Sequence, residues 1–172
     1  FAANAWRRPT TDDEEDQLRD LYQRFRTEEL GHEASIRLLI ARILTSPRFL
    51  YRSEEPAPGP ETLPVHPHEL ATRLSYFLWG SQPDAELRAL AAANALLDER
   101  TLKRQLHRML SDPRAKRLAI EFASQWFHLR DFDQNDQKNE SLFPEFAMLR
   151  DAMYQEVLNL CAQIFQDNRS IL

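Results

Sequence analysis

Apolar residues in the first third of the chain recur at the spacing of one helix face. They follow the string Thr11-Asp-Asp-Glu14, which has the form of a capping box and starts a helix. Gly31 stands where a left-handed residue ends such a helix. The pattern predicts an amphipathic helix between them, whose buried face is formed by Leu18, Leu21, Tyr22 and Phe25.

A second helix is predicted over residues 36–44, where apolar residues again recur at three and four positions. Ser46-Pro47 directly after it fits the N-cap and first position of a short third helix. These elements form a helical hairpin, and we expect an N-terminal domain over residues 1–53. Residues 54–67 then hold five of the ten prolines, which favours extended backbone. We therefore place a proline-rich linker at residues 54–66.

Helical spacing returns after the linker. Prolines tolerated in a first helical turn precede four of the apolar segments: Pro67, Pro83, Pro113 and Pro144. The patterns predict helices at about residues 68–79, 83–93, 99–110, 113–129 and 144–166, with the polar run 131–140 as a loop. The first of these is apolar nearly all round, which is typical of a central helix. The fold class is therefore all-α, with a bundle of about five helices over residues 67–172 that we expect to be truncated at its C-terminus.

The last predicted helix carries two apolar stripes. The first consists of Phe146, Leu149, Met153, Val157, Leu160 and Ile164, and the second of Tyr154, Leu158, Cys161 and Phe165. Two stripes are wider than one neighbour needs. We expect one stripe to contact the bundle and the other to mediate a homodimer through this helix.

Charge narrows the classes of partner. The 172-residue chain has a net charge of −5, and its 22 Lys and Arg are scattered among 27 Asp and Glu. This composition disfavours a nucleic-acid partner. Its uncharged runs are too short for a membrane span. The chain begins at Phe1 without a methionine, so we expect it to be a segment of a longer protein.

Metal and haem chemistry find no support in the residue spacing. No two of the five histidines lie at i, i+4, and His66 and His68 at a helix start are expected to point to different sides. Cys161 lacks a basic neighbour and is interpreted as a core residue. No Cys-x-x-Cys-His string occurs. We assign this segment no metal and no cofactor, and any haem would belong elsewhere in the parent protein.

We interpret the remaining polar and aromatic residues as structural. Glu69 and Arg73 stand at the spacing of a helix ion pair. Aromatic residues at helical spacing are interpreted as core rather than as a ligand groove: Phe77, Trp79, Phe122, Trp126 and Phe127. Should the chain belong to an enzyme, the candidate catalytic residues are Arg73, Tyr76, Glu121 and Gln125.

Several strings carry a resemblance to known families. In the second half they are Arg73-Leu-Ser-Tyr-Phe-Leu-Trp79, Ser81-x-Pro83-Asp84-x-Glu86-Leu87 and Arg108-Met-Leu-x-Asp-Pro-Arg114. In the first half they are Ala5-Trp6-Arg7-Arg8-Pro9 and Ser46-Pro47-Arg48-Phe49-Leu50-Tyr51. With these the chain resembles tandem domains of unknown function from large planctomycete-type multidomain proteins, which often also carry a c-type cytochrome domain or a carbohydrate-binding module.

The resemblance implies an exported, periplasmic or cell-envelope parent, in which the other domains of the same chain are the expected partners. We interpret the segment as a non-catalytic structural or interaction module of a redox-associated protein. The alternative is the helical part of an enzyme that acts on polysaccharide or in c-type-cytochrome-linked oxidation, with its site completed by downstream sequence. A concave pocket holding the candidate catalytic residues would favour the enzyme, whereas their burial in helix contacts would favour the module.

Overall fold

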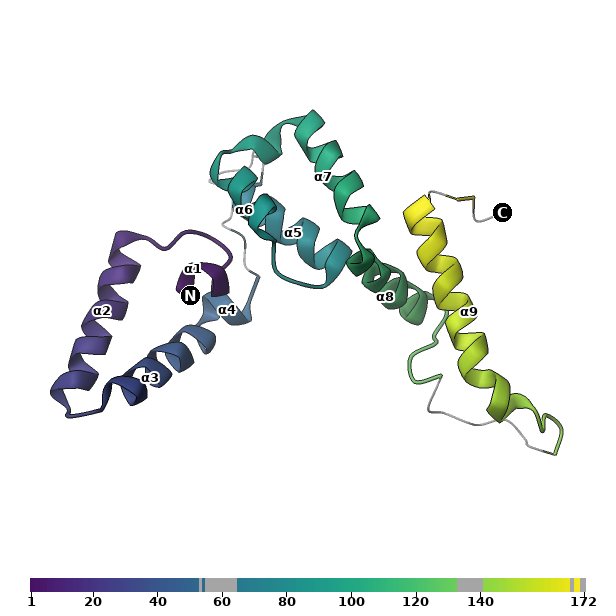
Figure 1. Cartoon of the computed structure of the whole chain (residues 1–172), viewed down its shortest axis with the longest axis horizontal. Helices are drawn as coiled ribbons and strands as arrows, with labels where there is room; N and C mark the ends of the chain where they lie inside the picture. Colours follow the sequence, from purple (N-terminus) through teal and green to yellow (C-terminus); the bar gives the residue numbers. More distant parts are fainter. Residues whose placement is uncertain (53, 55–64, 133–140, 168, 171–172) are drawn as a thin grey trace, which may run out of the picture. The chain divides into compact units, whose positions relative to one another are not determined.

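The computed structural model describes residues 1–52, 54, 65–132, 141–167 and 169–170 (Figure 1). In these residues the regular structure is entirely helical, which confirms the all-α prediction. The chain divides into two compact units, Phe1–Leu70 and Ala71–Leu172. Most of the predicted linker, residues 55–64, and most of the predicted loop, residues 133–140, lie outside the described residues.

The N-terminal unit is the predicted helical hairpin with a short helix added at each end. Helices α2 (Asp12–Thr27) and α3 (His32–Leu44) pack against each other, and α1 (Ala2–Ala5) and α4 (Pro47–Leu50) both contact α3. Its core consists of Ala5, Trp6 and Ile43, with Ala2, Leu18 and Phe49 packed against them. Both ends of the hairpin are therefore joined to α3.

The ends of α2 show one prediction confirmed and one wrong. Thr11 and Glu14 form the predicted capping box, in which each side chain accepts a hydrogen bond from the other residue's amide. At the other end the left-handed residue is Glu29, with φ 62°, and not Gly31. The amides of Glu29 and Leu30 donate to carbonyls of the last helical turn, an arrangement that ends the helix two residues early. Gly31, with φ −60°, is the N-cap of α3 instead.

In its described residues the C-terminal unit contains the five predicted α-helices and two short 3₁₀ turns. They are α5 (Pro67–Trp79), whose first turn belongs to the N-terminal unit, α6 (Ala85–Ala92), η1 (Ala95–Leu97), α7 (Glu99–Ser111), η2 (Pro113–Ala115), α8 (Lys116–Trp126) and α9 (Phe146–Asp167). Turn η1 packs against both α6 and α7, and α8 lies beside α9 (Figure 1). The prolines at 67 and 113 open their elements as predicted, whereas Pro83 and Pro144 precede theirs by two residues. For α6 the reason is Asp84, whose carboxylate caps the Leu87 amide.

The aromatic residues are only partly core, which corrects the prediction. Trp79 is fully buried, but Phe77 is 67% exposed. Helix α5 is therefore not surrounded by neighbouring elements on all sides, as a central helix would be. On α8 and its C-cap, Phe122, Trp126 and Phe127 are all exposed. The small residues Ala119 and Ala123 let α9 pack closely against α8, and the large rings therefore lie at the edge of that contact.

The two stripes of α9 have the roles of core and surface. Leu158 and Cys161 of the second stripe are buried against α8, with Tyr154 and Phe165 packed beside them. The first stripe leaves Leu149, Met153 and Leu160 between 45% and 57% exposed. The surface available to a partner therefore consists of Leu149, Met153 and Leu160 of the first stripe. Val157 of that stripe packs beside the core, as the side chain of Phe165 does, and Leu158 belongs to the core.

Candidate functional site

Strings that carry the family resemblance in the second half meet around Asp84. Its carboxylate caps α6 by accepting from the Leu87 amide at 2.9 Å. It also accepts two hydrogen bonds from Arg108 of α7, Nη1–Oδ2 at 2.7 Å and Nη2–Oδ1 at 3.2 Å. This two-pronged geometry fixes the orientation of both groups. Asp84 thereby ties the start of α6 to the end of α7.

The same arginine organises a polar chain between α7 and α6. Arg108 Nε donates to Gln105 Oε1 at 2.8 Å, and Gln105 Nε2 donates to Glu86 Oε1 at 2.7 Å. Gln105 is 1% exposed, so its amide has both oxygen and nitrogen hydrogen-bonded where water is excluded. A buried amide satisfied in this way stabilises the helix contact.

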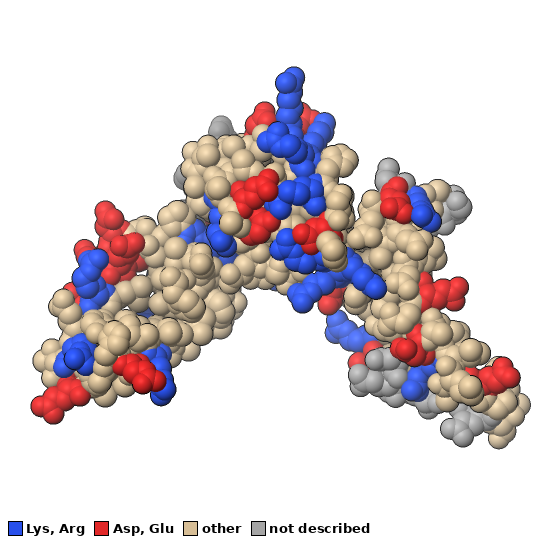
Figure 2. All heavy atoms as spheres, in the orientation of Figure 1, with Lys and Arg blue, Asp and Glu red and all other residues tan. Residues whose placement is uncertain are grey.

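Trp79 of α5 contacts the arginines of this cluster. Its indole nitrogen donates to the Met109 carbonyl at 2.9 Å. The Arg114 guanidinium carbon lies 3.5 Å from the ring centroid and that of Arg108 lies 5.5 Å away. Two cations over one aromatic ring provide a strong cation–π contact. Figure 2 shows acidic and basic side chains side by side over α5 to α7, rather than a field of one sign.

The charges and hydrogen bonds of the cluster hold Asp84 and Asp112 ionised. Burial would raise the pKa of Asp84, but the hydrogen bonds from Arg108 and the Leu87 amide, with the Arg108 and Arg114 charges, lower it. The Arg114 side-chain and backbone hydrogen bonds lower the pKa of Asp112 to about 2. An ionised, arginine-paired carboxylate is a poor proton donor and a weak base at neutral pH. The geometry thus suits a structural clamp better than acid–base catalysis.

A second cluster of the same kind lies in the N-terminal unit. Trp6 donates through its indole nitrogen to Ser46 Oγ at 2.9 Å, and that hydroxyl donates to the Ile43 carbonyl at 2.6 Å. Arg48 lies over the Trp6 ring at 5.5 Å and pairs with Glu14 at 2.9 Å. Here too, residues from the strings that carry the family resemblance contact one another: Trp6, Ser46 and Arg48.

Two more arginines complete this second cluster. Arg8 pairs with both oxygens of Glu14, at 2.7 and 2.9 Å. The hydrogen bond from Arg8 lowers the pKa of Glu14 to about 2 although burial opposes it. Arg7, which is 6% exposed, donates to carbonyls of α4 and its C-cap, including those of Arg48 and Tyr51. A buried guanidinium thereby satisfies the carbonyls at the end of α4.

The candidate catalytic residues lie outside both clusters. Arg73 and Tyr76 are in α5, the first exposed and the second half-buried. Glu121 and Gln125 lie one turn apart on α8, and both are exposed. Both pairs are therefore on helix surfaces of the C-terminal unit.

The histidines and the cysteine are placed differently from one another. His66 and His68 stack with ring centroids 5.5 Å apart, which corrects the expectation that they diverge. His66 precedes α5, and its Nδ1 accepts a hydrogen bond from the His68 amide. Because His66 is not a helical residue, helix geometry does not determine where its ring points. In the described residues no group of three His, Cys, Asp or Glu side chains could hold a metal ion. Cys161 is buried, and burial raises the pKa of its thiol.

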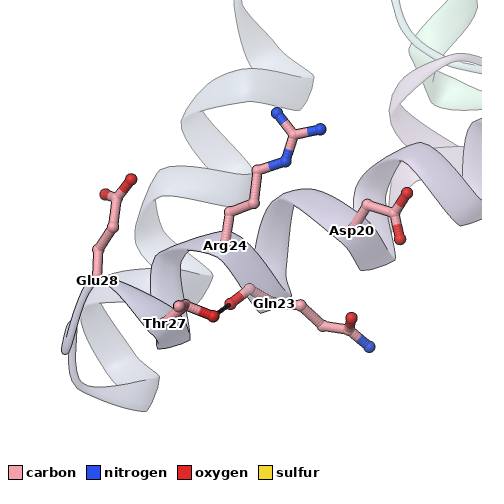
Figure 3. A pocket seen from close by; sticks show the side chains of 5 residues that line it. All are labelled: Asp20, Gln23, Arg24, Thr27 and Glu28. Carbon is pink, nitrogen blue, oxygen red and sulfur yellow. Dashed lines mark hydrogen bonds between the residues drawn. The ribbon is translucent and has the colours of Figure 1, made fainter.

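The surface also has a shallow depression on the last turns of α2. It is lined by Asp20, Gln23, Arg24, Thr27 and Glu28. Figure 3 shows these side chains pointing in different directions rather than toward one point, with the Thr27 hydroxyl bonded to the Gln23 carbonyl. Side chains that diverge in this way offer no common point at which a ligand would be held. Nor does any helix among the described residues combine the length and apolarity that a membrane span requires.

The fold and its two clusters define an all-helical tandem of two small units. A family model described as a protein of unknown function (DUF1592) matches residues 65–172, and one described as a protein of unknown function (DUF1595) matches residues 1–54. The chain belongs to the DUF1592 family and carries a DUF1595 domain before it. No curated protein and no solved structure matches the chain significantly.

The pairing of Asp84 with Arg108 and that of Glu14 with Arg48 were not predicted from the sequence. Asp84, Arg108 and Arg48 lie in the strings that carried the resemblance, whereas Glu14 lies in the capping box at residues 11–14. What recurs in the strings of both halves is a Trp and an Arg, the two residue types of a cation–π contact.

Proposed function

We propose that this chain is a non-catalytic structural or interaction module of a larger multidomain protein. The two tryptophan clusters support a structural role, since their arginines and carboxylates pair with each other and their indoles are buried. Tandem family matches support a multidomain parent. The resemblance to large multidomain proteins supports an exported, envelope-associated and redox-associated parent, with its other domains as partners.

The exposed stripe of α9 is the observation that carries the interaction role. Leu149, Met153 and Leu160 lie along one side of a 22-residue helix and keep about half of their surface in water. Leaving apolar surface exposed forgoes roughly 25 cal/mol for each Å² that a partner would cover. Exposed apolar side chains aligned on one helix side mark an interaction surface. In the isolated chain a second copy provides the partner surface, so the module forms a homodimer through α9.

Light scattering on a size-exclusion column tests this proposal. We expect concentration-dependent dimerisation of the wild-type chain, and a monomer for Leu149→Glu with Met153→Glu. Gln155→Glu is the matched control, because Gln155 is exposed on the same helix and away from the stripe. Strictly monomeric wild-type protein at high concentration contradicts the homodimer, as does a dimer that both glutamate substitutions leave intact.

A further inference from the structure

The sequence contains a repeat that links the two units. Residues 42–48 read Arg-Ile-Leu-Thr-Ser-Pro-Arg, and residues 108–114 read Arg-Met-Leu-Ser-Asp-Pro-Arg. Four of the seven positions are identical, and the others exchange similar side chains. The similarity extends upstream, where Glu33 pairs with Arg37 on α3 and Glu99 pairs with Lys103 on α7, at matching positions.

The backbone of the two segments is similar. Both end a helix of 13 residues. Thr45 and Ser111 each donate through the hydroxyl to the carbonyl four residues earlier, at 2.9 Å in both units. The following residues have nearly equal torsions, with φ −70° and ψ 147° at Ser46 and φ −78° and ψ 138° at Asp112.

Backbone hydrogen bonds repeat as well. The amide of Ser46 donates to the Ile43 carbonyl at 3.2 Å, and that of Asp112 to the Met109 carbonyl at 3.3 Å. Each of these two residues then accepts from the amide three positions later, at 3.0 and 2.9 Å. A proline occupies the first position of the next short helix in both units.

A tryptophan from a different helix docks on each turn. Trp6 caps α1 and Trp79 ends α5, and the residue after each is left-handed, Arg7 with φ 61° and Gly80 with φ 60°. The indole of Trp79 donates to the Met109 carbonyl directly, whereas that of Trp6 reaches the equivalent Ile43 carbonyl through the Ser46 hydroxyl. The relay requires a donor, which the Asp112 carboxylate lacks.

Each turn ends with an arginine that lies over its tryptophan, Arg48 in one unit and Arg114 in the other. Each arginine approaches a carboxylate at the start of the helix that follows the tryptophan: Glu14 of α2 at 2.9 Å, and Asp84, the N-cap of α6, at 3.9 Å. A Ser-Pro or Asp-Pro helix start is common by itself. It does not impose a docked tryptophan, a left-handed residue after it, and a carboxylate from the next helix.

We infer that the two units contain two copies of one structural module, in which a turn with the pattern Arg-x-Leu-(Ser/Thr)-(Ser/Asp)-Pro-Arg is clamped on a tryptophan. This inference is independent of the proposed interaction role. It assigns Trp6 and Trp79 equivalent structural positions, and it relates the DUF1595 match to the DUF1592 match through a shared element.

Exchange of the two heptapeptides in the full chain tests the inference. One variant places the sequence of residues 108–114 at 42–48 through Ile43→Met, Thr45→Ser and Ser46→Asp. A second variant makes the reverse exchange through Met109→Ile, Ser111→Thr and Asp112→Ser. The control carries the same heptapeptides shifted by one position, which moves the proline out of the first helical position.

We expect both in-register variants to retain cooperative unfolding and the shifted controls to lose the transition. The variant with Ser46→Asp should melt somewhat lower than the wild type, because the carboxylate has no proton to donate to the Ile43 carbonyl. Ser46→Asp and Asp112→Ser as single substitutions keep the test decisive if a triple variant fails to fold, with Ser46→Leu as control. The inference is overturned if Ser46→Asp lowers the melting temperature as much as Ser46→Leu, or if in-register exchange abolishes folding as the shift does.

Discussion

Arg108 and Asp84 come from different helices and meet through two hydrogen bonds, of 2.7 and 3.2 Å. Both side chains are less than one third exposed. The pair therefore joins α6 to α7 more effectively than a surface ion pair would, because water and salt screen it less.

Replacing Asp84 by Ala should destabilise the chain by about 2–4 kcal/mol, since it removes both a helix cap and the partner of Arg108. Denaturant unfolding measures the loss. Asp98→Ala is the control, because Asp98 caps α7 through the Thr101 amide at an exposed site. A double-mutant cycle with Arg108→Ala should give a coupling energy of roughly 0.5–3 kcal/mol. Additive effects would show that the ion pair contributes nothing.

The two C-terminal tryptophans should respond differently to truncation. Trp79→Ala empties a fully buried site and is expected to cost ~3–5 kcal/mol, whereas Trp126, which is 66% exposed, should cost about 1 kcal/mol or less. Thermal unfolding compares them directly. Equal losses would mean that the Trp126 ring is covered in solution.

The different burial of Trp79 and Trp126 could not be predicted from the sequence. Helix positions follow from caps and spacing, and the Thr11–Glu14 capping box was predictable for that reason. Spacing gives the direction of a side chain on its helix, but not how far the neighbouring helix extends. Small residues such as Ala119 determine where α9 packs on α8, and this contact leaves Trp126 exposed.

The ion pairs of the two tryptophan clusters could not be predicted from the sequence either. Asp84 and Arg108 are 24 positions apart, and Glu14 and Arg48 are 34 apart. Their pairing depends on tertiary packing, which periodicity does not encode. The scatter of 22 Lys and Arg among 27 Asp and Glu is visible in the sequence, and Figure 2 shows both charges side by side over α5 to α7 on the face that it draws.

Two buried serines should show opposite responses to alanine. Ser46→Ala removes the acceptor of the Trp6 indole and should cost ~1–3 kcal/mol. The Ser75 hydroxyl is buried and has no hydrogen-bond partner among the described residues. Ser75→Ala should therefore be neutral or slightly stabilising. Chemical denaturation of both variants checks this, and a clear loss for Ser75→Ala would show that its hydroxyl is bonded in solution.

Acid should loosen the N-terminal unit through Glu14. Its pKa falls from 4.5 to about 2 on folding, so its contribution is complete above pH 4.5 and is lost as the pH falls toward about 2. Glu14→Gln should be less stable at neutral pH and should lose less stability across that window. Amide exchange in α2 follows this unit. Parallel pH profiles of wild type and variant would contradict a role of the Glu14 charge.

Peroxide footprinting of methionines tests the proposed interaction surface most directly. The chain has three methionines: Met109 is fully buried, Met148 is 85% exposed away from the stripe, and Met153 is 45% exposed within it. In dilute solution we expect Met148 and Met153 to oxidise and Met109 to resist. At high concentration, and in the full parent protein, Met153 should become protected while Met148 stays reactive. Oxidation of Met153 at an unchanged rate in both settings would contradict an interaction module that docks through α9.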